Sequence, residues 1–193
     1  MGETTGISWT DSTWSPLRGC SVASPGCENC YAAGIAARFS GSGLPFEGFA
    51  KKSAKRGLPQ WTGKVELRPE HLADPLRWRK GRRIFVSSMS DVFHEELSNE
   101  DIAAIFGVMA AAPQHTFQVL TKRAERMKAW FDWFRAELGD EADAATDRSN
   151  ECLARLLASF AQSELGDGSS ADEDRQFWRI NNAISQARSE KVL

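Results

Sequence analysis

The chain has 193 residues, of which 41% are hydrophobic and 26% charged, and its formal net charge is −2. This composition is ordinary for a globular protein and argues against wholesale disorder, which needs fewer apolar residues and a larger net charge. We find neither the apolar run of about 18 residues that spans a membrane nor the basic and apolar regions of a secretory signal. We therefore expect a cytoplasmic protein without membrane contact.

Charge divides the chain into two parts. Residues 1–138 carry 18 Lys and Arg against 15 Asp and Glu, whereas residues 139–193 carry 6 against 11. The second part combines helical patterns with the acidic, Gly- and Ser-rich linker GDGSSADED. The sequence thus predicts a domain that leans basic over residues 1–138 and an acidic helical segment over residues 139–193.

Strand and helix patterns alternate along the first part. Strands are predicted at residues 6–9, 64–67, 83–88 and 115–121. Helices are predicted over about 29–39, from Pro69 with an interruption at Pro75, from an N-cap at Ser98 to the residues before Pro113, and from Arg123 onward. Residues 10–30 and 40–60 are interpreted as loops, the second basic. Such alternation predicts an α/β fold of parallel-stranded βα repeats, followed by a helical C-terminal segment.

Three polar segments follow predicted strands. They are the Cys-rich loop, the SMSDVFHEE segment and the LTKR turn. In parallel α/β folds the functional residues gather at the carboxyl ends of the strands. We therefore expect these three segments to open onto the same face of the molecule.

Three of the four cysteines, Cys20, Cys27 and Cys30, lie within eleven residues. Thiols stay reduced in the cytoplasm, so clustered cysteines there are more often metal ligands than disulfides. Pro25 and Gly26 suit a turn just before Cys27. That turn would bring Cys20 round to the pair formed by the other two thiols.

The number of thiols bears on the metal. Three thiolates are one short of the set that structural zinc prefers, and they suit a 4Fe–4S cluster with one iron left open. Zinc with His94 or Cys152 as a fourth ligand stays an alternative, as does the absence of any metal.

Three blocks of the sequence resemble a known family. ISWTDSTWSPLRGCSVASPGCENCYA, FVSSMSDVFHEE and HTFQVLTKRAERM are similar, in this order, to a phage-associated family of unknown function. Members of that family are similar to radical S-adenosylmethionine (SAM) enzymes and carry the same three-cysteine motif. The resemblance covers about residues 7–128. It implies a TIM-barrel-like fold of the radical SAM type, a 4Fe–4S cluster and SAM as cofactors.

The resemblance also assigns residues. Cys20, Cys27 and Cys30 would be the cluster ligands, and Tyr31 would form an aromatic wall beside the cluster or the adenine. Members of the family continue with further strand blocks that we do not find here. The chain is therefore expected to supply about half of a barrel, as a truncated gene product, as a fragment, or as a half that a partner chain completes.

The remaining polar residues at the strand ends have expected roles toward the same cofactor. Ser88, Ser90 and Asp91 are candidates for hydrogen bonds to the SAM amino group or ribose. Lys122 and Arg123 are candidates for holding a carboxylate or a substrate phosphate, the arginine by a two-pronged contact. Alternatively, Asp91 caps the turn after its strand, and the two cations are surface charges at the start of a helix.

The sequence supports three functional hypotheses. The first is a radical SAM-like iron–sulfur enzyme that cleaves SAM to act on an unknown substrate. The second is a metal-stabilised nucleic-acid-binding module, suggested by the basic runs KKSAKR and RWRKGRR beside Trp61 and Trp78. The third is a truncated, inactive half-barrel.

Overall fold

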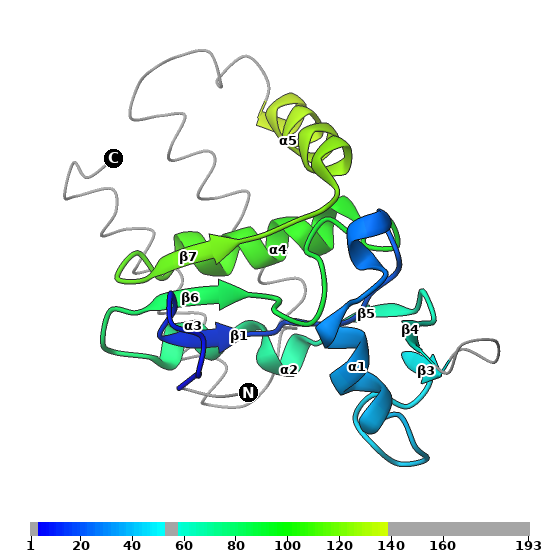
Figure 1. Ribbon diagram of the computed structural model, residues 1–193. Coiled ribbons are helices and arrows are strands. Elements are labelled where there is room, and N and C mark those ends of the chain that lie inside the picture. Colours follow the sequence, from blue (N-terminus) through cyan, green and yellow to red (C-terminus); the bar gives the residue numbers. More distant parts are fainter. Residues whose placement is uncertain (1–3, 53–57, 139–193) are drawn as a thin grey trace.

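The computed structural model of the chain describes residues 4–52 and 58–138. Its centre is a three-stranded parallel sheet in the order β1 (Ser12–Trp14), β6 (Arg83–Val86) and β7 (Thr116–Val119) (Figure 1). Trp14 pairs with Val86, and Val86 pairs with Val119, so the three strands end at the same edge. The predicted α/β architecture with parallel strands is confirmed.

The helices follow the punctuation of the sequence. They are α1 (Tyr31–Arg38), α2 (Pro69–Leu72), α3 (Asp74–Arg77), α4 (Asn99–Ala110) and α5 (Ala124–Leu138). As predicted, the helix that begins at Pro69 is interrupted near Pro75, which opens α3. Ser98 caps α4, since its hydroxyl accepts the Asp101 N–H while the Asp101 carboxylate accepts the Ser98 N–H.

Two antiparallel ladders were not expected. β2 (Leu17–Gly19) pairs with β5 (Val65–Leu67), and β3 (Ala50–Lys52) pairs with β4 (Pro59–Trp61). The interpretation of residues 10–30 and 40–60 as loops is therefore wrong at β1, β2, β3 and β4. The partner of β2 lies far along the chain, whereas β3 and β4 pair with each other over a short separation. The described residues form an open parallel sheet with two small ladders, and they do not confirm a TIM barrel.

The strand predicted at residues 6–9 is also wrong. Pairing with β6 begins at Asp11, whose N–H donates to the Arg83 carbonyl and whose carboxylate accepts from the Arg83 backbone and guanidinium. Before that point the chain turns, with the Thr10 N–H donating to the Ile7 carbonyl. The turn sets the Trp9 ring 4.8 Å from the Phe85 ring, so aromatic packing replaces the predicted pairing.

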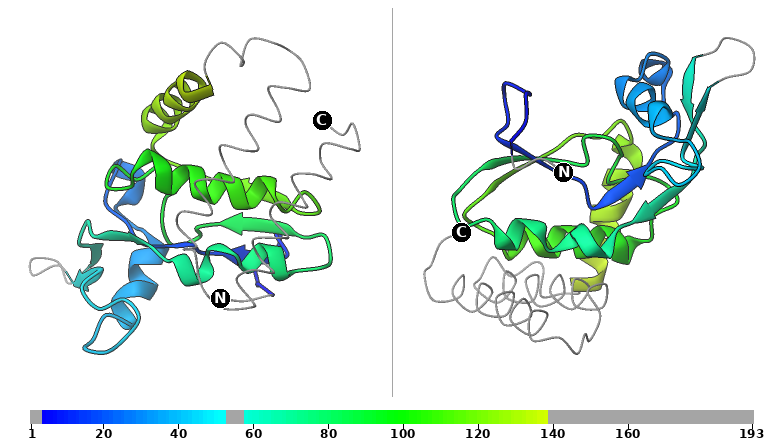
Figure 2. Two further views of the ribbon diagram at one scale, coloured as in Figure 1. Left: turned by 180° about the vertical axis from the view of Figure 1, so that it is seen from behind. Right: turned by 90° about the horizontal axis from the view of Figure 1, so that it is seen from below.

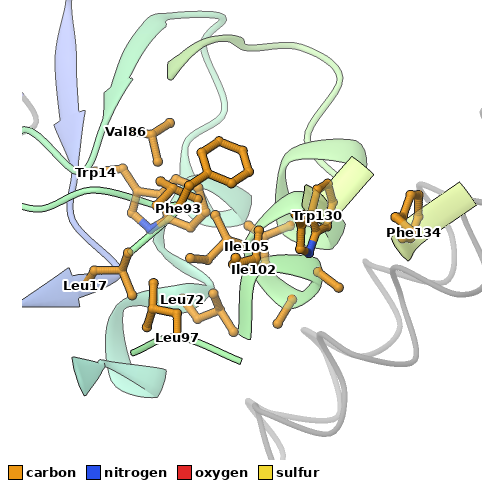
Figure 3. Close-up of a cluster of buried hydrophobic side chains, with 14 of the residues drawn as sticks. Trp14, Leu17, Leu72, Val86, Phe93, Leu97, Ile102, Ile105, Trp130 and Phe134 are labelled. Carbon is orange, nitrogen blue, oxygen red and sulfur yellow. The ribbon is translucent and has the colours of Figure 1, made fainter. Parts of the chain in front are cut away.

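The main core lies between the sheet and helices α4 and α5 (Figure 3). Trp14 is fully buried there, and its indole N–H donates to the His71 carbonyl at 2.8 Å. From α5, Trp130 and Phe134 stack with their centroids 5.1 Å apart, as expected for core residues at helical spacing. This core holds the carboxyl ends of the strands in place.

A second, smaller core joins α1 to β3 and β4. Its buried side chains are Ala32, Ala33, Ala36, Phe49, Ala50 and Trp61. Cys20 and Cys30 pack against it from one side and Met89 from the segment after β6. The Cys-rich loop, including the short 3₁₀ turn Pro25–Cys27, therefore lies where the two cores meet.

The layers are visible in Figure 2, where α4 lies against one face of the sheet while α1 and residues 4–10 lie toward the other. Within the part of the chain that the structure describes, no helix is both long enough and apolar enough to cross a membrane. The acidic helical segment expected at 139–193 lies outside the described residues.

Gly19, the last residue of β2, provides a test of this architecture. It adopts φ +90°, and a Cβ added there would lie 2.0 Å from the Lys64 carbonyl oxygen and 2.7 Å from the Phe49 ring. We expect Gly19→Ala to lower the free energy of unfolding by at least about 2 kcal/mol, because left-handed backbone and overlap both oppose it. Urea unfolding followed by circular dichroism measures this.

Gly34 of α1 is the matched control. Apart from its chain neighbours and the backbone of its own helix, no atom among the described residues lies within 4 Å of the position its Cβ would take. Gly34→Ala should therefore stabilise the protein by about 0.5–1 kcal/mol through helix propensity. Equal effects of the two substitutions would contradict the close approach of β2 to residue 64.

Candidate functional site

A pocket of about 290 Å³ lies at the carboxyl end of the parallel sheet. Its walls come from the Cys-rich loop, from residues 87–91 after β6 and from residues 120–123 after β7. Parallel strands end at one edge of a sheet, which is why these segments meet. The predicted convergence is confirmed. The pocket is lined by all nine residues that the sequence analysis assigned to the cluster, to SAM or to the substrate, namely Cys20, Cys27, Cys30, Tyr31, Ser88, Ser90, Asp91, Lys122 and Arg123.

Asp91 is buried at the pocket wall, with 6% of the residue exposed. Its Oδ1 accepts from the Phe93 N–H at 3.0 Å and from the Thr121 hydroxyl at 2.7 Å. Its Oδ2 accepts from the Lys122 N–H and from Arg123 Nη1, both at 3.1 Å. A carboxylate offers about four acceptor positions, and these contacts use them all. Asp91 therefore caps its own turn and braces the end of β6 against the segment after β7.

Arg123 is the buried partner of this carboxylate, with only 4% of its side chain exposed. Its Nε donates to Glu95 at 2.8 Å, and Nη1 lies 4.0 Å from the Cys20 sulfur as well as bonding Asp91. Nη2 donates to the carbonyl and the hydroxyl of Ser21 at 3.3 and 2.7 Å. The interpretation of this arginine as a surface charge is wrong. The guanidinium instead holds the Cys-rich loop to the ends of β6 and β7.

His94 reinforces the same loop from the segment after β6. Its Nδ1 accepts the Glu96 N–H at 3.2 Å, which leaves the proton on Nε2, and Nε2 lies 2.8 Å from the Ser21 hydroxyl. Burial, followed by the nearby Arg123 charge, lowers the pKa of His94 below its ordinary value of 6.5. With both ring nitrogens engaged, this side chain is poorly placed to serve as a fourth zinc ligand.

The electrostatic environments of two thiols differ. Burial raises the pKa of Cys20, and the Arg123 guanidinium opposes that rise. At Cys27 partial burial opposes ionisation, but hydrogen bonds from the backbone of Ala23 and Ser24, together with Lys122, outweigh it and lower the pKa. Each of the two adjacent cations thus lies beside one cysteine. Arg123 lies beside Cys20, and Lys122 Nζ lies 3.7 Å from the Cys27 sulfur.

Three further hydrogen bonds connect the segments that form the pocket walls. The Tyr31 hydroxyl, at the start of α1, donates to the Ser88 carbonyl at 2.7 Å and so links the Cys-rich loop to the segment after β6. Lys122 Nζ donates to the Gly26 carbonyl at 2.8 Å. The Ser90 hydroxyl donates to the Leu17 carbonyl at 3.4 Å.

Sequence reasoning missed three polar residues that line the pocket: Ser21, Ser87 and Thr121. Each is next to a residue that was singled out, so their positions after cysteine and after strands were a usable signal. Their roles could not be predicted from the sequence, because the Ser21 hydroxyl, for example, accepts a hydrogen bond from Arg123, a residue 102 positions away.

The donor set suits a thiolate-ligated cluster. The three thiols are free and partly buried in one pocket, and cationic side chains lie beside two of them. Iron–sulfur clusters are held by thiolates, and neighbouring cations favour the thiolate form. Over residues 4–52 and 58–138, no three His, Cys, Asp or Glu side chains are arranged so that together they could hold a metal ion. The pocket therefore agrees with an iron–sulfur site in the chemistry of its donor atoms and in its charge.

The basic runs considered for nucleic acid lie apart from the pocket or outside the described residues. RWRKGRR runs from the last residue of α3 to the first residue of β6 and so lies at the amino end of the sheet. In this run the Arg82 guanidinium donates to the Ser12 hydroxyl and covers the Trp78 ring, while Arg83 pairs with Asp11. Most of KKSAKR, residues 53–56, is not described.

Together, the fold and the site define an α/β protein with a thiol-lined pocket at the carboxyl end of a parallel sheet. Residues 4–179 match the family described as "Protein of unknown function (DUF5131)", and the chain belongs to that family. The match includes all the motif blocks of the sequence and extends past residue 138. No curated protein and no solved structure shows significant similarity to the chain.

Replacing Arg123 with Met tests the buried ion pair. The substitution leaves the Asp91 carboxylate buried without its charged partner, so we expect a loss of about 3–5 kcal/mol in the free energy of unfolding. Urea unfolding measures the loss. Arg83→Met is the control, because its pair with Asp11 is half exposed and screened by water, and it should change stability little. Similar losses in both variants would argue against the special role of Arg123.

His94 predicts a pH dependence of stability. Its pKa is lowered in the folded state, so at mildly acidic pH the unfolded chain binds a proton at His94 that the folded chain does not bind. Stability is then lost as the pH falls below about 6.5, the ordinary histidine value. We expect the wild-type chain to lose more stability than His94→Gln between pH 7.5 and pH 5.5, by chemical unfolding. Equal losses would mean that His94 does not contribute.

Proposed function

We propose that this chain is a radical SAM-type iron–sulfur protein that cleaves SAM to act on a substrate yet to be identified. The observation that carries the proposal is the gathering of three free thiols and two cations in one pocket at the end of a parallel sheet. The resemblance of the three motif blocks to a phage-associated, radical SAM-like family supports the same chemistry.

In this proposal Cys20, Cys27 and Cys30 hold a 4Fe–4S cluster. Such a cluster supplies, when bound, one electron that breaks a carbon–sulfur bond of SAM and so yields a radical that abstracts hydrogen from the substrate. An external one-electron reductant restores the electron. The protein contributes the position of the bound molecules, the exclusion of water and the local charge.

The pocket residues fall into two groups. Some hold the Cys-rich loop in place, and the others contact the bound molecule. Asp91 and Arg123 have their hydrogen-bonding positions filled by protein groups, so they fix the Cys-rich loop. Lys122, which is exposed, supplies positive charge beside Cys27 and a contact for a carboxylate. Ser88 and Ser90 supply hydroxyls for the SAM amino group or ribose.

Apolar side chains also line the pocket. Phe85, Met89 and Leu120 line the pocket, and Tyr31 forms its edge beside Cys30. Apolar and aromatic walls exclude water and accept flat rings. Tyr31 is 60% exposed, so it is placed to cover a ring that enters from the solvent side.

We extend the proposal to the fold. A β-strand, a helical crossover and a parallel strand form the repeating unit of a TIM barrel, and β6, α4 and β7 are one such unit. Within the described residues β1 and β7 are the edge strands. Further strands, from a partner chain in our proposal, would pair at these edges and complete the barrel.

Anaerobic reconstitution tests the function. The chain is loaded with iron and sulfide, both are counted, and electron paramagnetic resonance spectra of the reduced protein are recorded with and without SAM. We expect a 4Fe–4S signal that changes when SAM is added. The signal should be lost when Cys20, Cys27 or Cys30 is replaced by Ala.

Cys152→Ala is the matched control, because the fourth cysteine lies outside the three-cysteine motif and the variant should load like the wild type. A folded chain that takes up zinc, or takes up iron without any effect of the three cysteines, would contradict the proposal.

A further inference from the structure

Ser87 follows β6 directly and lines the pocket, yet the site described above gives it no role. Its backbone is held from both sides. The Ser87 N–H donates to the Trp14 carbonyl at 2.7 Å, and its carbonyl accepts the Ser90 N–H at 3.0 Å. These bonds place the residue at the end of the central strand and at the start of the turn toward Asp91.

The backbone of Ser87 is strained. Its φ is 57°, and it is the one residue other than glycine with a positive φ in the described part of the chain. A side chain in the left-handed region costs roughly 1–2 kcal/mol, a cost that glycine avoids. Strain of this kind is commonly found at functional sites. An interaction of the serine side chain must therefore offset the free energy that the positive φ costs.

No such interaction is made within the described part of the fold. Ser87 is 3% exposed, and its hydroxyl has no hydrogen-bond partner among the described residues. A buried polar group without a partner costs about 1–3 kcal/mol. The neighbouring pocket hydroxyls differ, since Thr121 donates to Asp91 and Ser90 to the Leu17 carbonyl. In the protein alone, both the backbone and the side chain of Ser87 are unfavourable.

We propose that Ser87 is a ligand-binding residue, whose hydroxyl oxygen accepts a hydrogen bond from the small molecule that occupies the pocket. A ligand donor needs a buried acceptor, and the acceptor positions of Asp91 are already filled. Ser87 offers an unused acceptor next to the apolar side chains of Phe85 and Met89. In such surroundings a hydrogen bond fixes the orientation of an otherwise apolar contact.

The identity of the molecule rests on the proposed function. SAM carries donors that suit Ser87 in two parts of the molecule: the ribose hydroxyls and the adenine amino group of its adenosyl part, and the α-ammonium of its methionine part. The chemistry is the same for both, a donor that meets a neutral buried oxygen. Two fragments separate them, because 5′-deoxyadenosine carries only the donors of the adenosyl part, its ribose hydroxyls and adenine amino group, and L-methionine carries only the ammonium.

The experiment compares stability and binding in the same variants. Ser87→Ala and Ser87→Gly are made in the full chain, and SAM affinity is measured by calorimetry on the reconstituted protein. Thermal unfolding is measured without SAM. We expect both variants to bind SAM about 3- to 10-fold more weakly, the effect of losing one hydrogen bond. The fragment that loses affinity in Ser87→Ala identifies the part of SAM that Ser87 binds.

The same substitutions should not destabilise the protein. Ser87→Ala should leave the melting temperature unchanged or raised, and Ser87→Gly should raise it, because glycine also relieves the positive φ. Ser98→Ala is the matched control. Its hydroxyl caps α4, so its loss should lower the melting temperature while SAM affinity stays unchanged.

Three outcomes would overturn the inference. A melting temperature lowered in Ser87→Ala as much as in Ser98→Ala would mean that the fold itself uses the hydroxyl. Unchanged SAM affinity in a chain that binds SAM would remove Ser87 from the site and leave the proposed function intact. A reconstituted wild-type chain that binds neither SAM nor its fragments would instead remove the proposed function and, with it, the ligand named here.

Discussion

The site depends on one buried ion pair, Asp91 with Arg123. Burying two opposite charges costs several kcal/mol for each, and the cost is met only where every remaining hydrogen-bonding position is filled. Here the carboxylate receives the Phe93, Thr121, Lys122 and Arg123 donors, and the guanidinium contacts Glu95, Cys20 and Ser21 in addition. The pair therefore joins the ends of β6 and β7 to the loop that carries the cysteines. Its completeness makes the geometry specific, since a shift of any one partner leaves a buried charge unmatched.

The pair also explains why the pocket lies where two cores meet. The ends of β6 and β7 are fixed by the main core below the sheet, whereas Cys20 and Cys30 pack against the small core of α1, β3 and β4. Neither core alone determines the position of the cysteines relative to the strand ends. Arg123 bridges that junction through Ser21, and Tyr31 bridges it again through the Ser88 carbonyl. Polar contacts, which are directional, thus set the relative position of two apolar units, whose own packing is less specific.

Local sequence patterns correctly predicted the structural features that neighbouring residues determine. The β-branched run before Ser87, the cap at Ser98 and the break near Pro75 are each determined within a few residues, and each was predicted correctly. The pairings of β2 with β5 and of β3 with β4 join separate segments of three residues, too short to leave a periodic signal. The site shows the same division. The sequence predicted that Asp91 and Arg123 lie at one pocket, but a charged residue after a strand has the same pattern whether it meets a ligand or another side chain.

The contrast between satisfied and unsatisfied polar groups separates structural from binding residues in this pocket. A group that the fold uses is paired in the protein alone, as Asp91, Arg123 and Thr121 are. A group kept for a ligand costs stability until the ligand arrives, and Ser87 carries that cost in both its backbone and its hydroxyl. The thiols lie between these cases, because each of two has one cation beside it and coordinating capacity left over. At Cys27 the surroundings lower the pKa, whereas at Cys20 burial outweighs the Arg123 charge and raises it. Thiolates are the ligands that soft metal ions select, so these side chains keep a binding capacity that the fold does not use.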